Sequence, residues 1–122
     1  MFDHLSLGVE DLDRAATFYD AALAPLGYVR LSQNARSVCY GPLGFTGEAP
    51  FAIIAFGADA KPAGPGFHLA FAAPDRGAVD RFHAAALRAG GTDEGRPVSA
   101  NTTIRATTPR SSAIPTVIVS KR

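Results

Sequence analysis

The sequence predicts an α+β fold in which two βαβββ modules form a curved mixed sheet with helices on its outer face. Three observations predict it: one segment of the chain is present twice, each copy reads as a strand followed by a helix, and three further strand-like segments follow the first copy. The chain has 122 residues, of which 47% are hydrophobic, which is enough apolar surface for the core of one compact domain.

The two copies each begin at a histidine and end at a glycine. Residues 4–27 read HLSLGVEDLDRAATFYDAALAPLG, and residues 68–91 read HLAFAAPDRGAVDRFHAAALRAGG. The copies align without a gap, so that each has an aspartate before its helix and a phenylalanine within it. This correspondence indicates a duplicated half-domain of about 60 residues, too small to fold well alone.

The duplication predicts a single domain of two paired modules. Residues 1–57 form the first module, residues 58–66 the linker, and residues 67–122 the second module, which is atypical after residue 97. The junction reads GADAKPAGPG, and its glycines and prolines favour turns over regular structure.

Each predicted helix has recognisable ends. Asp11 and Asp75 are short acceptors placed to cap the first free amides, and Gly27 and Gly90 permit the left-handed residue that follows a last turn. Apolar residues recur between these ends at helical spacing. Strands are predicted at residues 2–9, 28–31, 37–40, 51–56 and 67–73, with a loop at residues 42–50.

Composition excludes several classes of function. Lys and Arg number 12 and Asp and Glu 11, so the net charge of +1 gives no electrostatic case for nucleic acid or a membrane surface. The single cysteine excludes an internal disulfide and a cysteine-rich zinc site. No apolar run is long enough for a membrane span, and the N-terminus lacks a secretory pattern. We therefore expect a cytoplasmic protein with a small-molecule partner.

Strand alternation predicts where the two repeat histidines point. His4 shares a face with Ser6 and Gly8, and His68 shares a face with the two alanines that follow at alternate positions. Small side chains leave room for a cavity on that face. Two converging imidazoles are suited to a divalent metal such as Fe, Mn, Zn or Ni. The alternative is that each histidine is half-buried and bonded to a backbone carbonyl.

Aromatic and basic residues offer candidates for substrate binding. Tyr40 and Phe51 are predicted to line the pocket, although core packing would also explain them. Arg30 and Arg36 could meet an anionic substrate, although exposed arginines need no such role. His83 lies mid-helix, where we expect a surface or packing role.

Four short motifs carry a resemblance to a known superfamily: HL at residues 4–5, APLG at 24–27, HLAF at 68–71 and APDR at 73–76. Together they are similar to the vicinal oxygen chelate superfamily, which includes glyoxalase, bleomycin-resistance and extradiol-dioxygenase-like proteins. The resemblance covers roughly residues 1–97. It implies paired βαβββ modules, a divalent metal in the cup of the sheet, and a homodimer.

By the same resemblance, His4 and His68 match the metal ligands on the first strand of each module. Residues 51–56 match the strand on which glyoxalase I carries a glutamate ligand, but this chain has only apolar residues there. No Asp, Glu or His follows Glu94, so the ligand of the last strand is missing too. Two imidazoles alone make a weak site, and we expect metal binding to be weak or absent.

The C-terminal residues 98–122 depart from the family in composition, being rich in Ser and Thr and lacking Gly and aromatic residues. We hypothesise that this tail is read in a shifted frame. Permissible codons in the next frame give a family-like ending with an Asp-Pro-Asp-Gly turn and an Ile-Glu strand, and the nucleotide sequence tests this. If the written tail is the real one, residues 102–107 and 116–120 have the pattern of closing strands.

Three functions follow from these features. The first is a metal-dependent lyase or dioxygenase whose ion holds two vicinal oxygens of a small substrate. The second is a metal-free protein that sequesters a small molecule, as bleomycin-resistance relatives do. The third is an inactive, frame-altered copy that keeps the fold.

Overall fold

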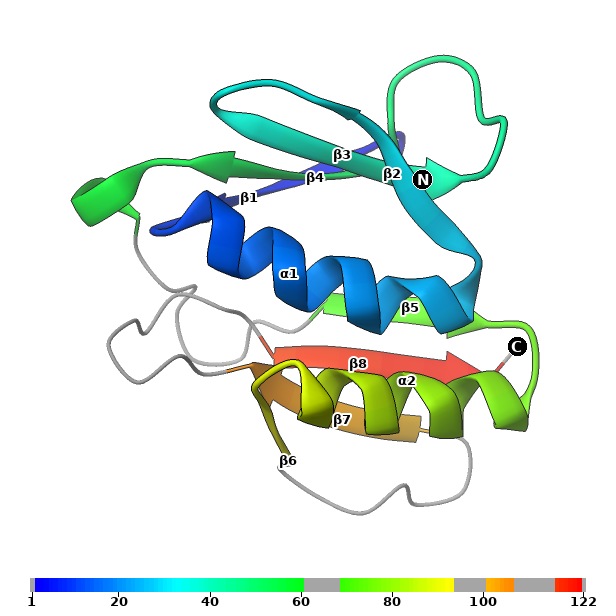
Figure 1. The fold of residues 1–122 in the computed structure, drawn as a ribbon. Coiled ribbons are helices and arrows are strands. Elements are labelled where there is room, and N and C mark those ends of the chain that lie inside the picture. The colour runs from blue at the N-terminus through cyan, green and yellow to red at the C-terminus, as the bar shows by residue number, and fades with distance from the viewer. Residues whose placement is uncertain (1, 61–68, 94–100, 107–115, 122) are drawn as a thin grey trace.

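The computed structural model describes residues 2–60, 69–93, 101–106 and 116–121, and it repeats one order of elements (Figure 1). The first half contains β1 (Leu5–Val9), α1 (Leu12–Leu23), the short 3₁₀ helix η1 (Ala24–Leu26), β2 (Tyr28–Gln33), β3 (Ser37–Pro42), β4 (Phe51–Ala55) and the short 3₁₀ helix η2 (Gly57–Asp59). The second contains β5 (Leu69–Ala73), α2 (Arg76–Arg88), β6 (Gly91–Asp93), β7 (Asn101–Ala106) and β8 (Thr116–Lys121). The predicted α+β class and βαβββ order are confirmed, including two strands in the Ser- and Thr-rich tail.

The strands divide into two four-stranded sheets with the same internal order. The first sheet runs β1-β4-β3-β2 and the second β5-β8-β7-β6. In each, the first strand is parallel to its neighbour and the remaining pairs are antiparallel. The duplication in the sequence is therefore also a duplication of topology. Together the two sheets form a curved, unclosed arrangement (Figure 1).

The helix ends agree with the predicted caps. The Asp11 carboxylate accepts the backbone N–H of Arg14 at 3.1 Å, and the Asp75 carboxylate accepts that of Ala78 at 2.7 Å. Gly27, at φ 82°, closes η1 in the left-handed region. Both N-terminal caps thus satisfy a backbone donor that the first turn would otherwise leave without a partner.

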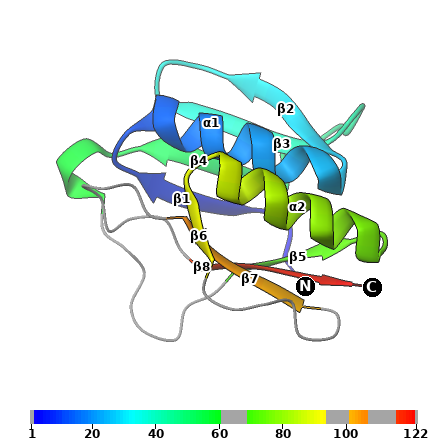
Figure 2. The ribbon, with the colours of Figure 1, turned by 60° about the horizontal axis from the view of Figure 1, so that its bottom comes forward.

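The core lies between the helices and the sheets and is continuous through both modules. Helices α1 and α2 contact each other, and Figure 2 shows them side by side. One continuous cluster of buried side chains contains residues from both halves, among them Val9, Ala15, Tyr19, Leu23, Ile53, Ala73, Val79, Phe82 and Ala86. Because this cluster is shared by the two modules, we do not expect either half to fold by itself.

The opposite side of the first sheet carries small side chains. The register aligns Ser6 with Ala52 and Cys39, on the side away from α1. Cys39 is half-buried there, not enclosed in the core. Within the described residues, no helix is both long and apolar enough to cross a membrane.

Candidate functional site

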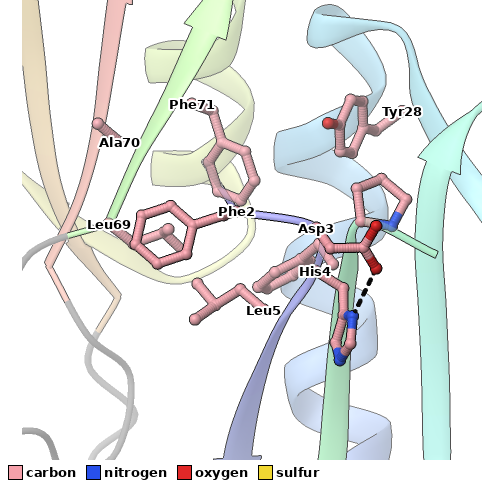
Figure 3. Close-up of a pocket in the computed structure, with 10 residues that line it drawn as sticks. Phe2, Asp3, His4, Leu5, Tyr28, Leu69, Ala70 and Phe71 are labelled. Atoms are coloured by element: carbon pink, nitrogen blue, oxygen red, sulfur yellow. Dashed lines mark hydrogen bonds and ion pairs between the residues drawn. The ribbon is translucent and has the colours of Figure 1, made fainter. Parts of the chain in front are cut away.

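A pocket of about 480 Å³ lies where the two modules meet (Figure 3). The first residues of four strands contribute to it: Leu5 of β1, Tyr28 of β2, Phe51 of β4 and Leu69 of β5. Leu5 and Leu69 occupy equivalent positions in the repeat, so the pocket lies at the junction of the duplicated halves. The remaining lining residues are Phe2, Asp3, His4, Pro50, Ala70 and Phe71.

Four aromatic rings, those of Phe2, Tyr28, Phe51 and Phe71, contribute to the wall. The ring of Phe71 meets that of Phe51 with centroids 5.3 Å apart and meets that of Tyr28 with centroids 6.0 Å apart, both edge to face. Phe51 is buried, and the ring of Tyr19 in α1 packs against it with centroids 5.1 Å apart. Phe2 is 92% exposed and lies at the rim, near Leu69 and Phe71 in Figure 3. The wall is therefore apolar and fixed on the strand side, with one exposed ring at its edge.

The polar end of the pocket is a pair of neighbouring side chains. His4 Nδ1 lies 2.9 Å from Asp3 Oδ2, and both side chains are substantially exposed. The hydrogen bond to Asp3 raises the pKa of His4 above its usual range, and the negative charge of Glu48 adds to the effect. Because the bond uses Nδ1, Nε2 is the nitrogen that His4 can offer to a ligand.

Several solved structures have a fold similar to that of this chain. A glyoxalase/bleomycin resistance protein from Albidiferax ferrireducens T118 superposes with a TM-score of 0.78 at 29% identity, over 100% of this chain and 98% of that one. The chain has the glyoxalase/bleomycin resistance fold. The fosfomycin resistance protein FosX from Mesorhizobium loti matches with a TM-score of 0.68 at 15% identity, over 100% of this chain and 92% of that one.

A glyoxalase-related enzyme from Fulvimarina pelagi is a further structure of the same fold, with a TM-score of 0.66 at 16% identity, over 100% of this chain and 88% of that one. By sequence, no family model and no curated protein matches the chain. The resemblance to the vicinal oxygen chelate superfamily is thus confirmed through the glyoxalase/bleomycin resistance fold of its structural neighbours.

Some of the site residues proposed from the sequence line the pocket and others do not. His4 lies at the polar end of the pocket and Phe51 in its wall. Tyr40 is buried at 0% exposure and is absent from the lining; its ring packs behind Phe51 with centroids 6.0 Å apart. His68 lies outside the described residues. The convergence of the two histidines therefore stays a prediction.

Asp3, Tyr28 and Phe71 are among the pocket residues that were not proposed from the sequence. Asp3 could have been found because it directly precedes a candidate histidine, and a neighbouring carboxylate commonly orients an imidazole. Tyr28 and Phe71 carry no such local signal. They come together only because the two modules pack against each other.

The hydroxyl of Tyr40 belongs to a separate polar cluster that joins α1, β2 and β3. It donates to Asp20 Oδ1 at 2.9 Å, and the Arg30 guanidinium forms an ion pair with the same carboxylate. Burial is the main cause that raises the pKa of Tyr40, and the bond to Asp20 adds to it. Arg30 therefore serves this cluster and does not face the pocket between the modules.

A metal centre needs several ligand side chains close together. Among the described residues, no group of three or more His, Cys, Asp or Glu side chains is close enough to hold an ion. The described lining of the pocket supplies one imidazole, that of His4, which is oriented by Asp3. This donor set does not by itself fit a three- or four-ligand site.

Proposed function

We propose that the chain is a small-molecule-binding protein of the glyoxalase/bleomycin resistance fold whose ligand occupies the pocket between the two modules. The observation that carries the proposal is the pocket itself: about 480 Å³, walled by aromatic and aliphatic side chains, with the Asp3–His4 pair as its polar end. That size and that balance of apolar wall and few polar groups are typical of sites for small organic ligands.

Phe51 is the ligand-contacting residue proposed in the wall, while Tyr40 supports its ring from the second layer. The exposed Phe2 lies where it could cover a bound molecule. Sequestration needs no catalytic group, so the Asp3–His4 pair would serve only to bind the polar part of the ligand.

The test is a fragment screen by amide chemical-shift mapping, using single- and double-ring aromatic compounds of neutral, cationic and anionic type. We expect shift changes to gather at Leu5, Tyr28 and Phe71. Leu69→Trp should fill the pocket and weaken binding at least about tenfold. Leu87→Trp, on the surface of α2, is the matched control and should bind as the natural chain does. Shifts that map elsewhere, or no binding fragment, would overturn the proposal.

A second candidate is the metal-dependent lyase or dioxygenase, with His4 and His68 as ligands. Two observations favour it. Asp3 orients the His4 ring as carboxylates orient metal-bound imidazoles, and the repeat partners Leu5 and Leu69, which follow the two histidines, line one pocket. A divalent ion there would polarise two neighbouring oxygens of a substrate.

Metal analysis separates the two functions. Because residues after Glu94 supply no acidic or imidazole ligand, we expect substoichiometric metal in the purified protein. Stoichiometric Fe, Mn, Zn or Ni that is lost in both His4→Ala and His68→Ala would establish the enzyme instead. A chain that binds neither metal nor fragments would be the inactive copy.

The proposal includes a homodimer. Within one chain, the two sheets are not hydrogen-bonded to each other, so β1 and β5 each have one edge without a strand partner among the described residues. Pairing with a second copy would cover such edges. Light scattering coupled to size exclusion tests this, and a monomer at micromolar concentration would exclude it.

A further inference from the structure

We propose that the pocket between the modules selects an organic cation with a flat aromatic body over neutral and anionic molecules of the same shape. This inference rests on the proposed function and adds the charge class of the ligand. It is carried by the distribution of charge and aromatic rings around the pocket.

The charged groups at the pocket are acidic. Asp3 contributes a carboxylate that is 83% exposed, and among the described residues that line the pocket none is Lys or Arg. Glu48, in the exposed loop before β4, is near enough for its charge to act on His4. The exposed Asp3 carboxylate, with Glu48 nearby, therefore gives the polar end of the pocket an acidic character that attracts a cation.

Arg30 and Arg36, which could have bound an anion, make contacts outside the pocket. Arg30 forms its ion pair with Asp20, in the cluster beside α1. The Arg36 guanidinium lies over the ring of Phe56, 5.9 Å from its centroid. Neither side chain lines the pocket, so an anionic ligand would meet the Asp3 carboxylate without an arginine to bind it.

The aromatic rings of the wall also favour a cationic ligand. Tyr28 and Phe71 lie on one side of the pocket and Phe2 at its rim, as Figure 3 shows. A ring face attracts a cation through its quadrupole, an attraction that a neutral ligand of the same shape does not gain. Phe2 is the most exposed of these rings and the one best able to turn its face toward a ligand.

The test compares three probes with one bicyclic skeleton: N-methylquinolinium, quinoline and quinoline-4-carboxylate. Affinities are measured by calorimetry or shift titration with the full chain at alkaline pH, where quinoline is neutral. We expect the cation to bind roughly tenfold more tightly than quinoline, and the carboxylate to bind most weakly.

Three variants show whether the preference arises at the polar end. Asp3→Asn should remove most of the difference in affinity between N-methylquinolinium and quinoline, and Glu48→Gln should remove a smaller part. Asp59→Asn, on η2 and outside the pocket lining, is the matched control and should leave the difference intact.

The outcomes separate this inference from the proposed function. Equal binding of cation and quinoline at the pocket, or a preference that survives Asp3→Asn combined with Glu48→Gln, would overturn the cation inference and leave the binding function standing. If none of the three probes binds and the fragment screen is also negative, both fail. A preference lost with the two carboxylates supports the inference.

Discussion

The rings of Phe51 and Phe71 meet edge to face, with centroids 5.3 Å apart and planes at 89°. Phe51 begins β4 of the first module and Phe71 lies in β5 of the second, and these strands belong to different sheets. Side chains on the two sheets therefore join the modules of one chain. The same contact forms the wall of the pocket, so module packing and the candidate site depend on the same residues.

Phe71→Ala should weaken the junction measurably. The substitution removes the contacts with Phe51 and Tyr28, and because Phe71 is only half-buried we expect a loss of about 2 kcal/mol in the free energy of unfolding, below the range for a fully buried phenylalanine. Urea denaturation followed by circular dichroism measures it. Phe45→Ala, in an exposed loop, should change the free energy by no more than about 0.5 kcal/mol. Equal losses in both variants would contradict the prediction.

The two buried tyrosines should make the fold sensitive to alkaline pH. Tyr19 and Tyr40 are almost fully buried, and burial raises the pKa of both above the usual value of about 10. Below that pH the phenols are neutral in both the folded and the unfolded chain, so the free energy of unfolding does not change through them. As pH rises above about 10, the unfolded chain ionises these groups and the folded chain does not, so stability falls.

Tyrosinate absorbance measures this effect directly. The chain has three tyrosines, and we expect two of them to ionise together with unfolding, not before it. Tyr19→Phe should reduce the slope of unfolding free energy against pH in that range. Reversible ionisation of all three in the folded state would show that burial does not protect them.

Much of the fold could be predicted because its signals are local. Asp11 and Asp75 precede helices by one residue and cap them as short acceptors do, and Gly27 adopts the left-handed backbone that ends η1. Strand alternation correctly placed Val9 toward the core. These features depend on a few neighbouring residues, and the repeat supports each of them twice.

The site was only partly predictable because it depends on how the two modules meet. His4 and Phe51 were proposed from the sequence and line the pocket. Tyr40 was proposed beside them, but alternation alone does not say whether a strand residue faces the helix. The Tyr40 side chain is buried, and its hydroxyl bonds to Asp20 of α1. Phe71 reaches Tyr28 only through packing between modules, which no periodicity encodes.

Gly41→Ala should be costly although it adds only one methyl group. A Cβ at this buried position of β3 would lie 2.7 Å from Leu31 Cδ1 and 3.0 Å from Pro50 Cδ. The leucine end can turn away, but the proline ring is fixed to the backbone, so we expect a loss of about 1–3 kcal/mol. Thermal and urea denaturation measure it.

Gly8→Ala is the comparison that tests this reasoning. A Cβ there would approach Phe56 Cδ2 at 3.1 Å, and the Phe56 ring is 49% exposed and able to move. The loss should therefore be smaller than at Gly41, and alanine's lower unfolded-state entropy offsets part of it. If Gly8→Ala lowered the free energy of unfolding more than Gly41→Ala, crowding against Pro50 would not be the main cause of the loss.

The Asp3–His4 pair predicts a shifted histidine titration. Because the hydrogen bond to Asp3 and the charge of Glu48 raise the pKa of His4, its ring proton signals should titrate above the usual value of about 6.5. Asp3→Asn should move the titration back toward that value, whereas Asp13→Asn, in the first turn of α1, should leave it unchanged.

The sign of the linked stability follows from the direction of this shift. A raised pKa in the folded chain means that the pair stabilises the fold fully below about pH 6.5, and that this contribution is lost as pH rises through the folded pKa of His4. Unfolding free energies on either side of that range should differ less in Asp3→Asn than in the natural chain. If the histidine titrates at its usual value in the natural chain, the Asp3–His4 bond does not persist in solution, and His4 has no oriented Nε2 to offer to any ligand.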